Sequence, residues 1–283
     1  MDFTKTKRNL LIFIVGVVIC GWVGSGFDIL TNQESEESLG MLLWLVSPLL
    51  VTLILRGFCG DGWKDIGIYP KIKQNYPWYI VSLLIFPMVT LIVLLLGKSF
   101  GWVDTSDFKF SIFLSAFAVT LIPNFFKNIP EEFVWQGYLT PKVLSLKLSD
   151  LKIYLIVGLV WATWHIPYYL FFLSREDFQN FTTQTVGTFI VLAFIVMVFW
   201  SITFVEIRRL TNSVWPTVLL HTVEDGLNIL FINGYIQFTQ GKDLLVSPIY
   251  GLVGIILHVT IGLTLRQIRI KRNDVNKVFV DVF

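Results

Sequence analysis

The feature that most constrains the fold is a series of apolar segments, each about 20 residues long, which recur along the whole chain. A helix needs about 20 mostly apolar residues to cross the hydrocarbon core of a bilayer. Segments of this kind occupy 9–27, 39–56, 77–97, 110–128, 152–173, 186–207, 214–232 and 246–265. The loops between them are too short for a soluble domain. The sequence therefore predicts an all-α polytopic membrane protein, with a bundle of about eight transmembrane helices in a single integral membrane domain, 1–283.

Composition supports a lipid environment. Hydrophobic residues make up 54% of the chain and charged residues 15%, whereas about a quarter of the residues of a soluble domain are charged. The net charge is only +2, and no basic run is interleaved with aromatic residues, so nucleic acid is excluded as a partner. The two cysteines are too few for a disulfide framework. The first apolar segment is interpreted as a retained span and not as a cleaved signal peptide.

The distribution of basic residues predicts the orientation. Most of the 22 basic residues lie before the first span, after the last one, or in the loops that share their side. Lys127 is assigned to this side as well. The other side holds Lys98, Lys109, Arg175 and Lys242, together with the acidic residues Glu34, Glu36 and Glu37. By the positive-inside rule, both termini are predicted to be cytoplasmic.

Two adjacent carboxylates, Glu131 and Glu132, follow Pro130 in the sequence IPEEFVWQGYL. A charged group within a bilayer costs at least about 2.5 kcal/mol, so it is retained where it is paired, hydrated or catalytic. Neighbouring side chains on a helix point about 100° apart. One glutamate can therefore face a cavity while the other takes a structural partner. The alternative is a solvated helix start at the interface, which Pro130 would suit.

Two histidines lie in later apolar segments. His165 follows Trp161 by four residues, and Asp225 follows His221 by four, so each pair shares a helix face. His165 can be a packed hydrogen-bonding residue, and the His221–Asp225 pair can be a polar clasp between helices. Counted from the basic flanks at 1.5 Å per residue, Glu131, His165 and His221 come to a similar depth of about 14–20 Å. The common depth predicts one site, which either holds a zinc ion or activates water directly.

The three segments together resemble the family of CAAX prenyl proteases and bacteriocin-processing proteins, also called the Abi or CPBP family. Its pattern is E-E-x-x-x-R, then F-x-x-x-H, then H-x-x-x-N or H-x-x-x-D. Here the motifs read EEFVWQ from residue 131, WATWH from residue 161 and HTVED from residue 221. Their order and spacing are intact over about 110–232, which is the expected catalytic core.

The resemblance implies an α-helical intramembrane endopeptidase whose active site opens to the cytoplasm. By motif position, Glu131 is the general base and His165 assists it. His221 and Asp225 line the oxyanion side or complete a metal site, and Glu132 supports them. A Zn²⁺ ion would be held by Glu131, His165 and His221, and the other mechanism described for this family is glutamate-dependent and metal-free. The expected partners are the lipid bilayer and a peptide or lipidated protein substrate, and the sequence does not set an oligomeric state.

Two positions, Gln136 and Trp161, depart from the motif pattern. Gln136 stands where the family has arginine, and a neutral amide cannot balance the charge of Glu132, which is then protonated or paired differently. Trp161 replaces phenylalanine, which is expected to be a mild change in an apolar wall. Asp225 is one of the two residues that the pattern allows at its position. Compared with asparagine it favours the metal mechanism, because an ionised carboxylate can be a metal ligand but cannot donate to an oxyanion.

The sequence leaves three functions open. The main hypothesis is an intramembrane endopeptidase, in a bacterial plasma membrane, that cleaves a CAAX-type, prenylated or bacteriocin-like substrate near the cytoplasmic face. The first alternative is a catalytically weak or inactive membrane scaffold or bacteriocin-immunity protein with the same fold, which the Gln136 replacement motivates. The second is a proton-coupled transporter with a relay of Glu131 and histidines, which requires a polar path across the whole membrane.

Overall fold

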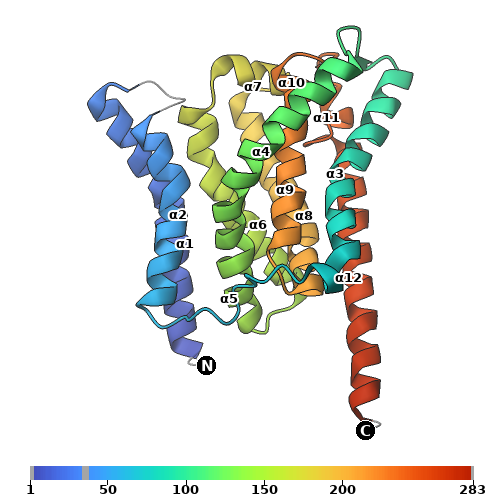
Figure 1. Cartoon of the computed structure of the whole chain (residues 1–283). Coiled ribbons are helices and arrows are strands. Elements are labelled where there is room, and N and C mark those ends of the chain that lie inside the picture. Colours follow the sequence, from blue (N-terminus) through green and yellow to red (C-terminus); the bar gives the residue numbers. More distant parts are fainter. Residues whose placement is uncertain (1–2, 34–37, 282–283) are drawn as a thin grey trace.

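The structure is a computed structural model that describes residues 3–33 and 38–281. Its helices form one bundle (Figure 1), and two short strands pair antiparallel at one end of it. The elements in chain order are α1 (Phe3–Thr31), α2 (Leu39–Gly57), α3 (Ile72–Ser99), β1 (Val103–Asp104), α4 (Phe110–Val134), the π-helical turn η2 (Trp135–Leu139), α5 (Thr140–Ser145), α6 (Asp150–Pro167), the π-helical turn η3 (Tyr168–Phe172), α7 (Arg175–Phe181), α8 (Val186–Thr211), α9 (Trp215–Leu227), α10 (Ile229–Ile232), β2 (Gln237–Phe238), α11 (Asp243–Val246) and α12 (Leu252–Asp281).

Within the described residues, seven helices are long and apolar enough to cross a membrane. They are α1, α2, α3, α4 with its continuation through α5, α6 with η3, α8 and α12. Each coincides with one of the predicted segments, so the all-α polytopic fold is confirmed. The remaining segment, 214–232, forms α9 and α10, which are too short to be counted among the seven. The first helix begins at the end of the bundle where α12 ends (Figure 1), and the membrane side of this end remains a prediction.

The short helix α9 lies inside the bundle. Helices α3, α4 and α8 pack around it, and nearly all of its residues are buried. Its acidic and histidine side chains therefore face protein and not lipid, which is how a segment this polar can lie at membrane depth. The outer faces of the bundle carry exposed apolar side chains such as Leu11 of α1, Leu50 of α2 and Leu84 of α3, as lipid contact requires.

Close packing of α6 against α8 depends on Gly158. A Cβ atom at this position would lie 2.5 Å from the Cα of Val198 and 2.9 Å from the carbonyl oxygen of Met197. Only glycine permits this separation of the two backbones. The contact fixes the half of α6 that carries the second motif, Trp161 and His165, against the core of the bundle.

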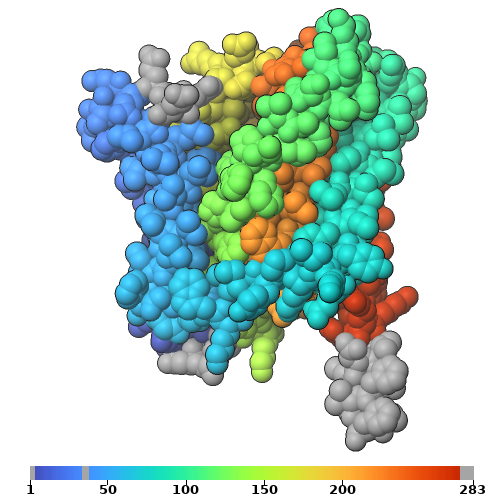
Figure 2. All heavy atoms as spheres, viewed as in Figure 1, coloured from blue at the N-terminus to red at the C-terminus, as the bar shows by residue number. Residues whose placement is uncertain are grey.

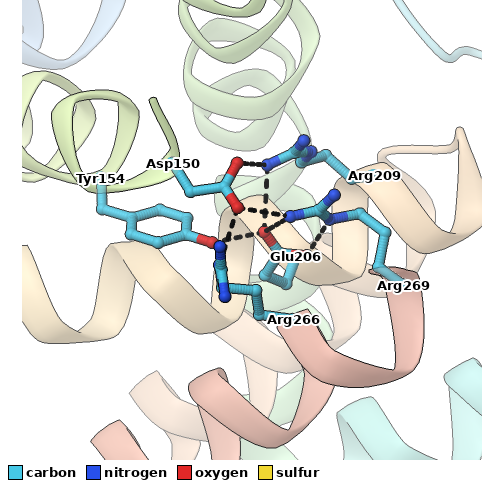
Figure 3. Close-up of polar contacts among 6 residues, drawn as sticks. All are labelled: Asp150, Tyr154, Glu206, Arg209, Arg266 and Arg269. Atoms are coloured by element: carbon cyan, nitrogen blue, oxygen red, sulfur yellow. Dashed lines mark hydrogen bonds and ion pairs between the residues drawn. The ribbon is translucent and has the colours of Figure 1, made fainter. Parts of the chain in front are cut away.

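A polar cluster fastens α12 to α6 and α8 near the end of the bundle that holds the termini. Figure 3 shows its members, which are Asp150, Tyr154, Glu206, Arg209, Arg266 and Arg269. Arg269 Nε lies 2.5 Å from Glu206 Oε2, and its Nη2 lies 2.8 Å from Asp150 Oδ2. Glu206 is fully buried, and a buried carboxylate is stable only when it is paired in this way. The cluster fixes the bundle away from the three motif segments and belongs to the framework of the fold.

Candidate active site

Glu131 lies near the end of α4 and faces a cavity. The helix runs through Pro130, so this proline is internal and does not begin a helix. Two indole N–H groups donate to Glu131 Oε1, that of Trp135 at 3.2 Å and that of Trp161 at 3.4 Å. Trp161 stands where the family pattern has phenylalanine, and this replacement is more than the mild change expected from the sequence. The indole adds a donor that holds the carboxylate of Glu131 in place.

Glu132 points away from the cavity and binds a histidine. Its Oε1 lies 2.9 Å from Nδ1 of His221, and its side chain is fully buried. A carboxylate partner on Nδ1 orients the ring and leaves Nε2 of His221 facing the cavity. That Nε2 lies 3.9 Å from Glu131 Oε1. The two adjacent glutamates thus have different roles, one facing the cavity and one supporting the histidine, as the 100° offset predicts.

The carboxylate of Asp225 has two donors on α4. Lys127 Nζ lies 2.9 Å from Asp225 Oδ2, and Asn128 Nδ2 donates to the same oxygen at 2.7 Å. Nε2 of His221 lies 3.9 Å from this oxygen. Both close contacts are made by donors, one of them a cation, so Asp225 acts here as an ionised acceptor. The assignment of Lys127 to a cytoplasmic flank is wrong, because the residue lies one turn from Glu131 and its side chain lines the cavity.

His165 lies on the opposite wall, near the end of α6. Its Nδ1 is 2.9 Å from the carbonyl oxygen of Trp161. A carbonyl oxygen only accepts, so Nδ1 carries the hydrogen and Nε2 keeps a free lone pair. Aromatic rings surround the imidazole, with Trp164 at 4.7 Å in an edge contact and Tyr169 stacked at 5.8 Å. The ring is held in one orientation among apolar neighbours, as a neutral base or metal ligand requires.

One cavity of about 290 Å³ joins these groups. Its polar lining is Lys127, Glu131, His165, His221, Glu224, Asp225 and Asn228. Most of the remaining wall is aromatic or aliphatic. Four of the five predicted catalytic residues therefore meet around a single space, while Glu132 lies behind His221. The roles assigned to them by sequence remain predictions, but the structure brings the three motifs together.

The π-helical turn η2 directly follows the glutamate pair, and two arginines from other elements bind it. Arg208 Nε, from α8, donates to the carbonyl oxygen of Gln136 at 2.8 Å. Arg56, from α2, donates to the carbonyl oxygen of Gly137. A π-helical turn disrupts the regular α-helical bonding, so its carbonyls need such partners. Both arginines are buried, and together they fix the turn that sets the direction of Glu131 and Glu132.

Gln136 occupies the position of the family arginine but does not pair with a glutamate. Its side-chain oxygen accepts a hydrogen bond from Thr140 Oγ1 at 2.9 Å. Glu132 is paired differently, with His221, as the sequence left open. The guanidinium that reaches this residue is that of Arg208, and it binds the backbone carbonyl.

The segment between α2 and α3, residues 58–71, covers the same end of the site. Asp65 lies 2.7 Å from Arg56 Nη1 and 3.0 Å from Lys142 Nζ. Burial alone would raise the pKa of Asp65, but the hydrogen bonds and charges of Arg56 and Lys142 outweigh it and hold the pKa below its ordinary value. Tyr138 donates to Asp61 at 2.6 Å. These bonds fasten the segment across the bundle beneath η2.

Metal donors are present in the cavity. His221, Glu224 and Asp225 offer ligand atoms that all lie within 4.8 Å of one another. The predicted ligands Glu131 and His221 are 3.9 Å apart, and His165 lines the same cavity. Nitrogen and carboxylate oxygen are the donors that zinc takes beside water, and the Glu132 bond to Nδ1 of His221 is typical of a metal-binding histidine. The residues thus fit a zinc ion.

Sequence reasoning missed Lys127, Asn128 and Glu224 as parts of the site. Lys127 precedes Glu131 by four residues, so the helical spacing alone places both on one face of α4. Glu224 lies one residue before Asp225, so helical spacing places it off the face that His221 and Asp225 share. It lines the cavity because α9 is enclosed by its neighbours.

Comparison with protein families agrees with the motifs. Residues 111–227 match the family model described as type II CAAX prenyl endopeptidase Rce1-like. The matched range contains all three motifs, and the resemblance predicted from them is confirmed over these residues. A search of curated proteins gave no match.

Proposed function

We propose, from the membership of residues 111–227 in the Rce1-like type II CAAX prenyl endopeptidases, that the chain is an intramembrane endopeptidase that hydrolyses a peptide bond in a membrane-associated substrate. The family supports an intramembrane protease in general terms. The observation that carries the proposal is the 3.9 Å separation of Glu131 Oε1 and His221 Nε2 on the wall of one cavity. A water molecule between two such atoms lies within hydrogen-bond distance of both, about 2.8 Å.

In this mechanism Glu131 is the general base. As the water oxygen bonds to the carbonyl carbon of the substrate, one water proton passes to Glu131. When the tetrahedral intermediate collapses, the carbon–nitrogen bond breaks and that proton passes to the leaving amine. The two indole donors hold the Glu131 carboxylate at the cavity wall, so little reorganisation accompanies the transfer.

Charge develops on the carbonyl oxygen during the attack, and two groups can stabilise it. Lys127 is a cation on the cavity wall, and an N–H at Nε2 of His221 faces the same space when that nitrogen is protonated. A fixed cation or N–H donor beside the developing oxyanion lowers the barrier. Asp225 holds the ammonium of Lys127 in position. We assign Asp225 to this orienting role, and His165, whose Nε2 keeps a free lone pair, to accepting a hydrogen bond from the attacking water.

A zinc ion is compatible with the same residues. Glu131, His165 and His221 would hold it, or His221 with Glu224 and Asp225. When bound, zinc supplies a Lewis acid that polarises the carbonyl and lowers the pKa of water. With the second set of ligands, Glu131 would stay free to act as the general base, whereas with the first set its carboxylate would be a ligand.

For the substrate we propose a lipidated CAAX-type or bacteriocin-like peptide, in a bacterial plasma membrane. Support comes from the largely aromatic and aliphatic wall beside the polar groups. The second candidate, a catalytically inactive scaffold or immunity protein, is favoured by one observation, the neutral Gln136 in place of arginine. Against it, Glu131, His165, His221 and Asp225 are all retained and converge on one cavity.

The proposal is tested with purified protein in liposomes. A prenylated peptide that ends in a CAAX sequence is compared with the same peptide lacking the prenyl group, each with and without a zinc chelator. Cleavage of the prenylated peptide supports the proposal. If that cleavage is lost in the presence of chelator, the reaction also requires a metal ion. If neither peptide, nor a panel of unrelated membrane peptides, is cleaved faster by the wild type than by His165→Ala, the scaffold is the better description.

A further inference from the structure

The two ends of the bundle differ in what they contain. One end, the terminal end, holds the start of α1, the end of α12, α5 and the segment 58–71 (Figure 1). The other, the opposite end, holds α7, α10 and α11. The helix α2 begins at the opposite end with Leu39 and finishes at the terminal end with Gly57.

The cavity extends from the catalytic groups toward the opposite end. Met41 and Leu45 line it from the first two turns of α2. Phe181, the last residue of α7, and Ile249, between α11 and α12, line it as well. Glu131, at the far end of α4, is the lining residue of that helix nearest the terminal end. The catalytic groups therefore form the floor of the cavity, and its walls rise from them toward the opposite end.

The terminal end is closed beneath this floor. Glu132, Gln136 and Tyr138 are fully buried there. The segment 58–71 crosses below α4 and α9 (Figure 2). It is bonded to its neighbours by side-chain and backbone contacts. Besides the Asp65 ion pairs, its Gly67 carbonyl accepts from the backbone of Val214 at 3.0 Å. Among the described residues that line the cavity, none belongs to segment 58–71 or to α5.

We propose that substrate enters the cavity from the opposite end of the bundle, so the bond that is cut is presented at the membrane face away from the termini. If the termini are cytoplasmic, as the basic residues predict, this is the extracytoplasmic face, whereas the sequence motifs led us to expect the cytoplasmic one. The inference rests on the proposed function for the act of cleavage, but the direction of the opening stands on geometry alone.

The lining also defines the class of substrate segment. The wall between floor and mouth is built from large apolar rings, among them Trp44, Tyr168 and Phe189. The floor holds three carboxylates, those of Glu131, Glu224 and Asp225, against one lysine and two histidines, of which only His221 has carboxylate partners. An excess of acidic groups repels anionic residues near the scissile bond. The site therefore takes an apolar peptide segment, free of acidic side chains, at the outer boundary of the bilayer.

The direction is tested by labelling single cysteines with a membrane-impermeant maleimide, in intact cells and in inverted vesicles. The background is Cys20→Ala with Cys59→Ser, so each variant carries one cysteine. Lys64→Cys, exposed in segment 58–71, marks the terminal face, and Glu176→Cys, exposed on α7, marks the opposite face. Met41→Cys and Leu45→Cys report the cavity. None of these positions belongs to the proposed catalytic machinery.

We expect both cavity cysteines to be labelled from the side that labels Glu176→Cys and not from the side that labels Lys64→Cys. Labelling from the Lys64→Cys side, or from neither side, overturns the proposal. A second arm supplies an impermeant peptide to one face at a time. Cleavage only at the Glu176→Cys face supports both proposals, whereas correct cavity labelling without cleavage at either face leaves the direction intact and counts against the protease.

Discussion

Nδ1 of His221 lies 2.9 Å from Oε1 of Glu132, and this contact gives the two adjacent glutamates different roles. Glu132 is fully buried and orients the histidine, while Glu131 faces the cavity with both of its indole donors. The Nε2 atom that faces the cavity is thereby the nitrogen left free for water or a metal. The arrangement predicts that the two glutamates respond differently to the same substitution.

Glu132→Gln is expected to reduce kcat by about 10- to 100-fold, the usual cost of losing the partner that orients an active-site histidine. The glutamine oxygen still accepts from Nδ1, but the charge that stabilises the ring is lost. His221→Phe is the matched comparison and should lose more, because the facing Nε2 disappears. The measurement is the turnover rate of each variant on one cleavable peptide. If the Glu132→Gln variant turns over more slowly than His221→Phe, the assignment of a supporting role to Glu132 is contradicted.

Lys127 and Asp225 are expected to behave as a coupled pair. Lys127→Gln leaves the Asp225 carboxylate with Asn128 alone, whereas Lys127→Gln combined with Asp225→Asn removes the charge as well. The double variant should be more stable than the sum of the two single effects implies, by about 0.5–3 kcal/mol. Thermal unfolding in detergent of all four proteins gives the coupling. Strictly additive effects would mean that the 2.9 Å contact has no energetic role.

Arg208→Gln is expected to lower both thermal stability and turnover. The variant removes a charged hydrogen bond to the Gln136 carbonyl, worth about 1.5–3 kcal/mol for a charged donor, and loosens the turn that directs the glutamate pair. Arg175→Gln, at an exposed position of α7, serves as the control and should match the wild type. If Arg208→Gln retains full turnover at a temperature where it is folded, the arginine supports the fold and not the site.

The pH dependence of stability should include a contribution from Asp65. Its pKa lies below the ordinary value in the folded protein, so its ion pairs stabilise the fold fully above about pH 4. The stabilisation is lost as the pH falls through the lowered folded pKa. Unfolding of the wild type and Asp65→Asn is compared from pH 7 down to pH 3. The difference in unfolding free energy between the wild type and Asp65→Asn should be constant near neutral pH and should shrink in acid. A difference that grows in acid would contradict the lowered pKa of Asp65.

Much of the site could be predicted from the sequence, because helical spacing determines which side chains share a face. The four-residue steps from Trp161 to His165 and from His221 to Asp225 fix which side chains share a face, and the structure brings both faces to Glu131. The apolar lengths likewise predicted seven of the spans. The remaining segment, 214–232, was predicted as a span because hydropathy does not distinguish a helix enclosed by protein from one in lipid.

Other features depend on contacts between distant segments, which no local pattern encodes. The turn η2 is held by Arg56 and Arg208, which lie 81 and 72 residues from their carbonyl partners. Lys127 is assigned to a flank of the span when only its position along the sequence is considered, because counting charges takes no account of contacts in the folded protein. The direction in which the cavity opens follows from how segment 58–71 folds back over α5 and η2, and a loop path of this kind is set by tertiary structure.

The central claim is that the Glu131 carboxylate activates water, and the most direct measurement is the single-turnover cleavage rate of a peptide by wild type and by Glu131→Gln in liposomes. Glutamine preserves the shape and still accepts the indole hydrogen bonds, but it cannot take a proton. The account predicts that the rate falls by about 10²–10⁴, the contribution of a general base, while thermal stability stays near that of the wild type. An equal rate in the two proteins would contradict it.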